Sequence, residues 1–157
     1  MSKKLFLIML LFSQLILAQD FNEEKTTLTN FLKRMYNSSP FEGVKVVEDY
    51  DKSYFISVVS LDKAKYPNTS TMTRVAQVKA RQQASAFFNG STISSDLVIR
   101  TTETKTKDST TTVTEMIESI KENSVGFVQG MELLSNFLIE EDKRMVFIYF
   151  RLLEKQE

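Results

Sequence analysis

The segment Met145–Leu153 constrains the fold most strongly, because it is apolar on both of the faces that a strand would present. Its β-branched and aromatic residues favour a β-strand. A strand that is apolar on both faces is usually central in a sheet that is covered on each side. We therefore expect a sheet with packed layers, and Met145–Leu153 as one of its interior strands.

Two segments have the apolar periodicity of a helix. In Asn22–Asn37 the apolar residues recur at helical spacing, and Asp20 or Asn22 can cap the start. In Thr69–Asn89 small and apolar residues share one face, which lets the helix axis lie close to a sheet. That face consists of Met72, Ala76, Ala80, Ala84, Phe87 and Phe88. We expect Gly90 to end this helix, since glycine adopts a positive φ without penalty.

The first strands are predicted as a hairpin. Val44–Val47 and Tyr54–Leu61 are β-branched or aromatic runs around a polar turn. Further along, Ile93–Thr104 alternates between apolar and polar residues, which predicts a half-buried strand with Ile93, Leu97 and Ile99 on one face.

The next part of the chain is less regular. Thr101–Thr114 is rich in threonine and charge, and predicts an extended hairpin arm or a mobile loop. Thr112–Asn123 fits either a short amphipathic helix or a strand; its apolar residues are Val113, Met116, Ile117 and Ile120. Val125–Ile139 predicts a strand in which Gly126 and Gly130 mark bulges or bends.

The order is therefore helix, hairpin, helix, strand, a segment of open assignment, and two C-terminal strands, the last two joined by a polar turn at Glu140–Lys143. This order predicts an α+β fold with a single, mainly antiparallel sheet and helices packed on it. We expect residues 19–157 to form one domain.

The first residues predict export. Lys3 and Lys4 precede an apolar run, Leu5–Leu17, and Ala18 is a small residue at a plausible cleavage point. This is the layout of a secretory signal peptide, so we assign residues 1–18 to one. The run is shorter than the ~20 residues of a membrane-spanning helix, and polar residues interrupt it, although an uncleaved anchor is the alternative.

Composition excludes several classes of function. The sequence has no cysteine, so lipid attachment at a cysteine, disulfides and thiol chemistry are excluded. It also has no histidine, the commonest metal ligand and general base. Removal of residues 1–18 takes away two of the 20 basic residues and leaves 18, against 20 acidic ones. A nearly neutral chain lacks the basic footprint of a nucleic-acid binder.

The motifs that suggest chemistry fail on inspection. Asp49, Asp51 and Ser53 begin like a calcium loop, but Tyr54 and Ser60 stand where such a loop needs glycine and a bidentate glutamate. We interpret this stretch as a hairpin turn.

Two further motifs have plainer explanations. The acidic residues of Glu140–Asp142 would share one solvated environment, whereas acid–base pairs need contrasting ones. Phe87 and Phe88 lack the basic residues of a stacking platform, so core packing is expected. We assign no catalytic, cofactor-binding or metal-binding residue and expect no enzyme activity.

Three features recur in an order that resembles a known group. They are the hairpin Val44–Leu61, the Ala76-Ala80-Ala84 helix, and the Ser124–Gly130 segment followed by the strand Val146–Leu152. The chain resembles the FlgO/FlgT-like domain of small periplasmic and outer-membrane assembly lipoproteins, across about residues 42 to 153. The resemblance implies a non-enzymatic envelope protein of larger assemblies. Those proteins commonly carry a lipidated cysteine, which this chain lacks.

We therefore expect a periplasmic or secreted protein, not a lipoprotein, that acts as a protein-interaction or assembly module. Its mature form would not span the membrane, and its partner would be an envelope protein that binds a sheet edge or the arm Thr101–Thr114. The alternative is a periplasmic carrier of a small molecule or glycan, with a pocket between the alanine-faced helix and the sheet. A filled core with an exposed edge favours the module.

Overall fold

The computed structural model describes residues 23–50, 52–66, 68–90, 97–101 and 107–154, with side chains from residue 112 onward in the last range. The chain divides into two compact units, Met1–Pro40 and Phe41–Glu157. The expected signal peptide, residues 1–18, lies outside the described residues.

In the first unit, residues 23–38 form a helix, which confirms the helix predicted from Asn22–Asn37. Leu28, Leu32 and Tyr36 are buried at helical spacing. The Ser38 hydroxyl and the Ser39 amide both donate to the carbonyl oxygen of Met35, at 2.9 Å, and close the last turn. The predicted caps, Asp20 and Asn22, lie outside the described residues.

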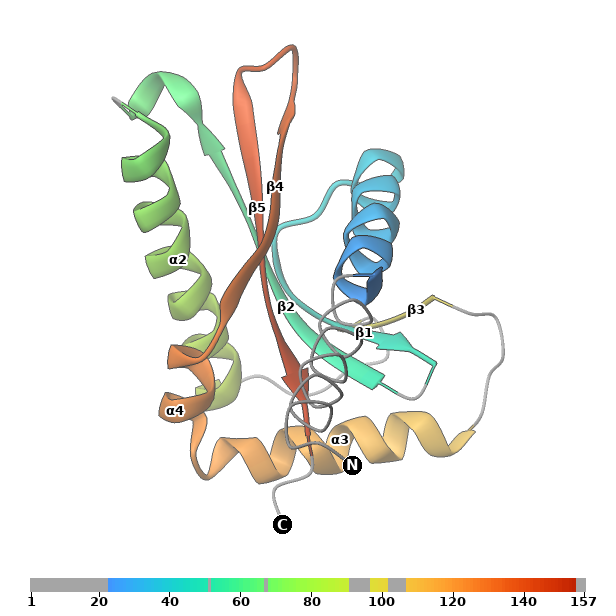
Figure 1. The fold of residues 1–157 in the computed structure, drawn as a ribbon. Coiled ribbons are helices and arrows are strands. Elements are labelled where there is room, and N and C mark those ends of the chain that lie inside the picture. The colour runs from blue at the N-terminus through green and yellow to red at the C-terminus, as the bar shows by residue number, and fades with distance from the viewer. Residues whose placement is uncertain (1–22, 51, 67, 91–96, 102–106, 155–157) are drawn as a thin grey trace, which may run out of the picture. The chain divides into compact units, whose positions relative to one another are not determined.

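The second unit is built on one five-stranded sheet (Figure 1). The strand order is β3-β1-β2-β5-β4, and every neighbouring pair is antiparallel except β1 and β3, which are parallel. The strands are β1 (Gly43–Asp49), β2 (Lys52–Asp62), β3 (Val98–Arg100), β4 (Glu132–Ile139) and β5 (Arg144–Leu153). The predicted α+β fold, the mainly antiparallel sheet and the first hairpin are confirmed.

Strand β5 lies between β2 and β4, as its two apolar faces predict. Phe147 and Ile148 point to opposite faces, and both are buried. Phe147 belongs to the core cluster that contains the alanines of α2 (Thr69–Gly90), so we call that side the α2 face. Because both sides of β5 are buried, this strand is one of the main structural supports of the unit.

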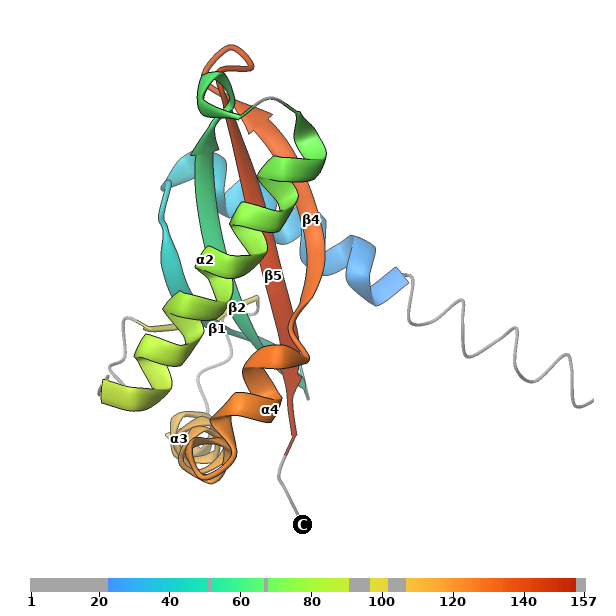
Figure 2. The ribbon, with the colours of Figure 1, turned by 90° about the vertical axis from the view of Figure 1, so that its left-hand side faces the viewer.

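Helix α2 crosses one face of the sheet (Figure 2) and confirms the predicted helix. Its buried residues are the six that the periodicity predicts: Met72, Ala76, Ala80, Ala84, Phe87 and Phe88. Asn68 caps its start by accepting a hydrogen bond from the Thr71 amide at 2.8 Å. Helix α2 extends to Gly90, the residue expected to end it, but the φ of Gly90 is not positive.

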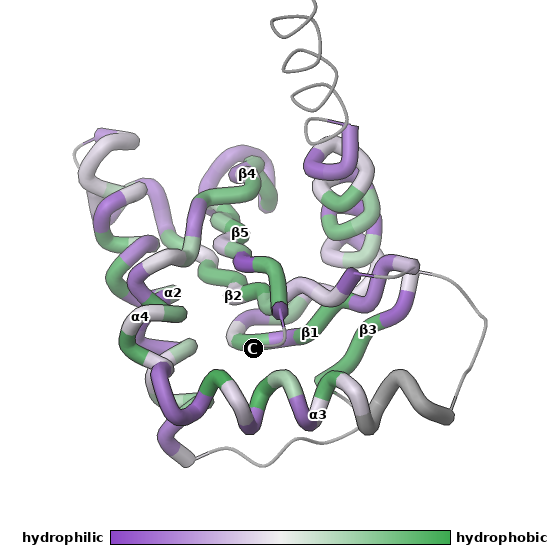
Figure 3. The backbone as a smooth tube through the Cα atoms, turned by 60° about the horizontal axis from the view of Figure 1, so that its bottom comes forward, coloured by the Kyte–Doolittle hydropathy of each residue, from purple (hydrophilic) through white to green (hydrophobic). Residues whose placement is uncertain are grey.

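Two segments expected to be extended are helical. Lys107–Lys121 forms α3, so the second half of Thr101–Thr114 is not an arm or loop, and residues 102–106 lie outside the described part. Figure 3 shows hydrophobic and hydrophilic residues alternating along α3, as in an amphipathic helix. Its buried residues, Val113, Ile117 and Ile120, join the core. The helical assignment of Thr112–Asn123 is therefore the correct one as far as Lys121.

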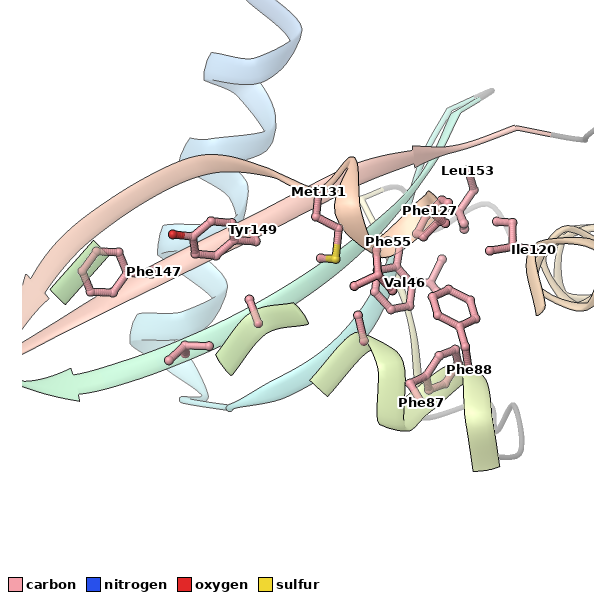
Figure 4. Packing of buried hydrophobic residues seen from close by; sticks show 14 of the residues in the cluster. Val46, Phe55, Phe87, Phe88, Ile120, Phe127, Met131, Phe147, Tyr149 and Leu153 are labelled. Atoms are coloured by element: carbon pink, nitrogen blue, oxygen red, sulfur yellow. The ribbon is translucent and has the colours of Figure 1, made fainter. Parts of the chain in front are cut away.

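The second correction concerns Val125–Ile139, which is not one strand. Ser124–Gln129 forms the short helix α4, and β4 begins only at Glu132. Gly126 therefore lies in a helix and Gly130 at its C-terminal cap, with φ of −81°. Four phenylalanines from three elements pack together around α4 (Figure 4): Phe55, Phe87, Phe88 and Phe127, with ring centroids 5.0–5.6 Å apart in the contacting pairs. Phe87 and Phe88 are core residues, as expected.

Strand β3, Val98–Arg100, is shorter than the predicted segment Ile93–Thr104. Val98 pairs with Val46 and packs with it against the core, whereas Ile99 pairs with Val47 on the other face. Residues 93–96 lie outside the described part. A 3-10 turn, Lys63–Lys65, follows β2, and Asp62 caps it by accepting from the Ala64 amide at 2.9 Å.

Candidate functional site

Strand β4 forms one edge of the sheet and is the best candidate for an interaction site. It has eight residues and pairs with β5 alone among the described strands. The opposite edge is β3, which has only three residues in the described part. Unpaired backbone groups along a strand edge can accept a further strand, and a long edge offers more of them than a short one.

A β-bulge at Leu134 decides which β4 side chains lie on the α2 face. Leu133 pairs with Tyr149, and the next registered pair is Ser135 with Ile148, so Leu134 is the extra residue. Tyr149 lies on the α2 face, since its hydroxyl donates to the Thr73 carbonyl of α2 at 3.0 Å. Leu133 therefore lies on that face as well. Without the bulge, the two-residue period of a strand would place it on the other side.

The remaining pairs define the rest of this surface. Asn136 pairs with Phe147 and Leu138 with Met145, and both partners pack on the α2 side of the core. Leu133 is 36% exposed, Leu138 is 40% exposed, and Asn136 between them is also exposed. We call Leu133, Asn136 and Leu138 the edge triad. It places two large apolar side chains in contact with solvent beside an open strand edge.

Two arginines hold the end of α4 that leads into β4. Arg151 of β5 donates to the carbonyl oxygens of Gly126 and Phe127, at 2.7 and 2.6 Å. Arg81 of α2 donates to the carbonyl oxygen of Gln129 at 2.9 Å. The last carbonyls of a helix carry partial negative charge, so these cations stabilise them. The start of β4 is thereby fixed, and positive charge is concentrated beside it.

Burial and the neighbouring Arg81 both affect the pKa of Tyr149. Burial raises the pKa of its phenol above the ordinary value of about 10, and the positive charge of Arg81 opposes part of that rise. The phenol is therefore neutral at physiological pH and serves as a hydrogen-bond donor to α2, which ties β5 to the helix next to Leu133.

The other end of β4 is acidic. Glu140, Glu141 and Asp142 form the β4–β5 turn, all exposed and all with positive φ. The Lys143 amide closes the turn on the Glu140 carbonyl at 3.1 Å, and Lys143 Nζ lies 3.4 Å from a Glu141 carboxylate oxygen. The predicted polar turn is confirmed.

The residues that the sequence suggested for chemistry are not assembled into a site in the described part of the chain. Asp49 accepts a hydrogen bond from the Thr101 hydroxyl at 2.6 Å, and Asp51 lies outside the described residues. No group of three or more acidic residues that could hold a metal ion occurs among the described residues.

The helices were assessed for membrane spans, and the chain was compared with known proteins. None of the helices in the described part of the chain combines the length and the apolar character that crossing a membrane requires. No family model, no curated protein and no solved structure matches the chain.

The sequence reasoning missed the edge triad because it took Val125–Ile139 as one strand. A visible signal was the pair of apolar doublets, Leu133-Leu134 and Phe137-Leu138, around a polar centre. The position of the bulge, which sets the face of each residue, has no such signal.

Proposed function

We propose that this protein is an exported, non-enzymatic module of the cell envelope that binds a partner protein by adding a strand of that partner to β4. Main-chain hydrogen bonds along β4 would supply affinity, and contacts with the edge triad would supply specificity. The tripartite start of the sequence supports export, and the resemblance to FlgO/FlgT-like assembly domains supports an envelope role.

The observation that carries the proposal is the edge triad. Natural proteins usually protect a sheet edge with charges, proline or a very short strand. Strand β4 is instead eight residues long, and its exposed apolar side chains, Leu133 and Leu138, lie beside the open edge. Glu132 at its start is charged, and its bulge is a second protective device, but that bulge brings Leu133 to the exposed surface.

The contact between α2 and the sheet counts against a carrier pocket at the alanine face. The Ser57 hydroxyl oxygen lies 3.3 Å from the carbonyl oxygen of Ala80, and Ala76, Ala80 and Ala84 are fully buried. A ligand cannot enter where strand and helix make direct polar contact. The module is therefore the function that these contacts support best.

The proposal is tested by site-specific photo-crosslinking in living cells. Leu138 and, separately, Leu133 are replaced by p-benzoylphenylalanine in the full-length chain, and adducts are identified by mass spectrometry after irradiation. Val78 is the matched control, because it is an exposed apolar residue of α2, 56% accessible and away from the edge.

We expect discrete adducts with an envelope protein at Leu138 and Leu133 and none at Val78. The absence of adducts at both edge positions, or the same adducts at all three, would reject β4 as the binding site. Catalytic turnover that is lost on mutation of one acidic or serine residue would reject the non-enzymatic assignment.

A further inference from the structure

The edge triad is symmetric about Asn136. Leu133, Asn136 and Leu138 pair with Tyr149, Phe147 and Met145, which are spaced two residues apart on β5. Because Leu134 is bulged out, Leu133 and Leu138 therefore lie at equal distances along the strand on either side of Asn136, all on the α2 face. Two-fold symmetric pairing needs a self-complementary patch, in which each residue meets its counterpart on the other copy. A strand with matching apolar residues at equal intervals from a central polar residue has this property.

We propose that β4 pairs antiparallel with β4 of a second copy of this chain, about a two-fold axis at Asn136. On the α2 face, Leu133 then lies opposite the partner's Leu138, and Leu138 opposite the partner's Leu133. Asn136 lies opposite the partner's Asn136, where the two amides can hydrogen-bond to each other. The five-stranded sheets of the two copies become one continuous sheet.

The register agrees on the second face as well. With one bulged residue in each strand, Ser135 lies opposite the partner's Phe137, and Glu132 opposite the partner's Ile139. Every pair therefore joins residues of the same face, which a regular antiparallel ladder requires. A central polar pair also disfavours slipped registers, since a shift would place an amide against leucine.

The ends of the strand are complementary in charge. In this register the acidic turn Glu140–Asp142 of one copy lies beside residues 129–131 of the other. That is where Arg81 and Arg151 bind the last carbonyls of α4. At each end of the shared edge an acidic turn thus lies near two arginines as well as Glu132, whereas a parallel arrangement would bring the two acidic turns together.

This inference rests on the proposed function, because it uses the same edge and names its partner as a second copy. The primary measurement is sedimentation equilibrium of the purified full-length gene product over a wide range of concentration. We expect a monomer–dimer equilibrium with no larger species, since closed two-fold pairing uses up the β4 edge.

Charge variants test the register. The double variant Leu133→Lys/Leu138→Lys places like charges opposite each other twice, so the dimer should be lost. The double variant Leu133→Lys/Leu138→Glu places opposite charges at the same positions, so the dimer should return. Val78→Lys is the control for added charge away from the edge and should leave the equilibrium unchanged.

A thiol cross-link locates the axis. The chain has no cysteine, so a single introduced thiol is the only one present. In Asn136→Cys the two thiols lie opposite each other, about 5 Å apart at Cβ, and a short bis-maleimide should give a covalent dimer. In Leu138→Cys and Val78→Cys the two equivalent thiols are far apart, and the dimer band should be absent.

A monomer at all concentrations overturns the inference. Because photo-crosslinking of Leu138 to another protein would still be possible, the proposed function does not fail with it. A dimer that survives Leu133→Lys/Leu138→Lys, or that cross-links at Val78→Cys but not at Asn136→Cys, uses a different face and also overturns it.

Discussion

The hydroxyl oxygen of Ser57 on β2 lies 3.3 Å from the backbone carbonyl oxygen of Ala80 on α2, and both residues are completely buried. The same hydroxyl oxygen lies 2.6 Å from Gln83 Oε1, so one proton is shared between two acceptors on the helix. A strand side chain reaches a helix backbone only where the helix side chains between them are very small. The alanine stripe of α2 provides this approach.

Ala80→Leu should therefore overpack the contact between α2 and β2. A leucine side chain at a position with no accessible surface must push the helix from the sheet, at a cost of about 1–3 kcal/mol in the free energy of unfolding. Urea denaturation measures it. Val78→Leu on the exposed side of the same helix is the control and should change the stability by less than about 0.5 kcal/mol. Equal effects of both substitutions would contradict this packing.

Phe147 and Ile148 test the burial of both faces of β5. Phe147→Ala should lower the free energy of unfolding by about 3–5 kcal/mol, and Ile148→Ala by about 2–5 kcal/mol, because each leaves a cavity in a packed layer. Leu138→Ala on the exposed edge should cost much less. If either Phe147→Ala or Ile148→Ala is tolerated in denaturant unfolding, the corresponding face of the sheet is open to solvent.

Gly130 is required by space, not by backbone conformation. A Cβ atom at this position would clash with Arg151 Nη1, which is held by two carbonyls of α4. Gly130→Ala should therefore displace the guanidinium and cost about 1–3 kcal/mol. In an Arg151→Ala background the same substitution should cost far less, because the obstacle is gone. Additive effects in this double-mutant cycle would refute the steric explanation.

Tyr149 should give the protein a stability that declines in alkaline solution. Burial raises the pKa of its phenol, so its contribution is complete below about pH 10 and is lost as the pH rises through the higher pKa of the folded state. Tyr149→Phe should be less stable at neutral pH by about 1 kcal/mol, because the hydrogen bond to Thr73 is lost. Its stability should fall less steeply than that of the wild type above pH 10, as measured by urea unfolding. Parallel profiles would contradict this assignment.

Export predicts a defined mature form. Expression of the full-length sequence should yield an exported protein that lacks about the first 18 residues, because cleavage is expected after Ala18. Intact-mass spectrometry of the exported fraction measures this directly. A protein that still begins at Met1 would mean that the apolar start is retained.

Elements whose apolar pattern repeats over several turns or along a whole strand could be predicted from the sequence. The stripe from Met72 to Phe88 identified both α2 and its buried face, because every position that faces the sheet is small or apolar. The two apolar faces of β5 likewise predicted an interior strand. In both elements every buried position is apolar. The prediction therefore did not require knowing which other element packs against them.

Short segments were decided by distant contacts. Ser124–Gln129 contains β-branched and aromatic residues that favour a strand locally, and six residues are too few for a stable isolated helix. Its helical form depends on Phe127 packing in the phenylalanine cluster and on Arg81 and Arg151 binding its last carbonyls. None of these partners is near α4 in the sequence.

The sequence by itself therefore determined the α+β class, the hairpins, the amphipathic α2 and the interior β5. The tertiary structure alone decided that β3 runs parallel to β1, that α4 is a helix and that Leu134 is bulged. The bulge matters most for function, because one extra residue reverses the face of everything before it in the strand. The pairing of β4 with β5 sets which residue is bulged out and so creates the edge triad. No local property of Leu133 or Leu134 decides it.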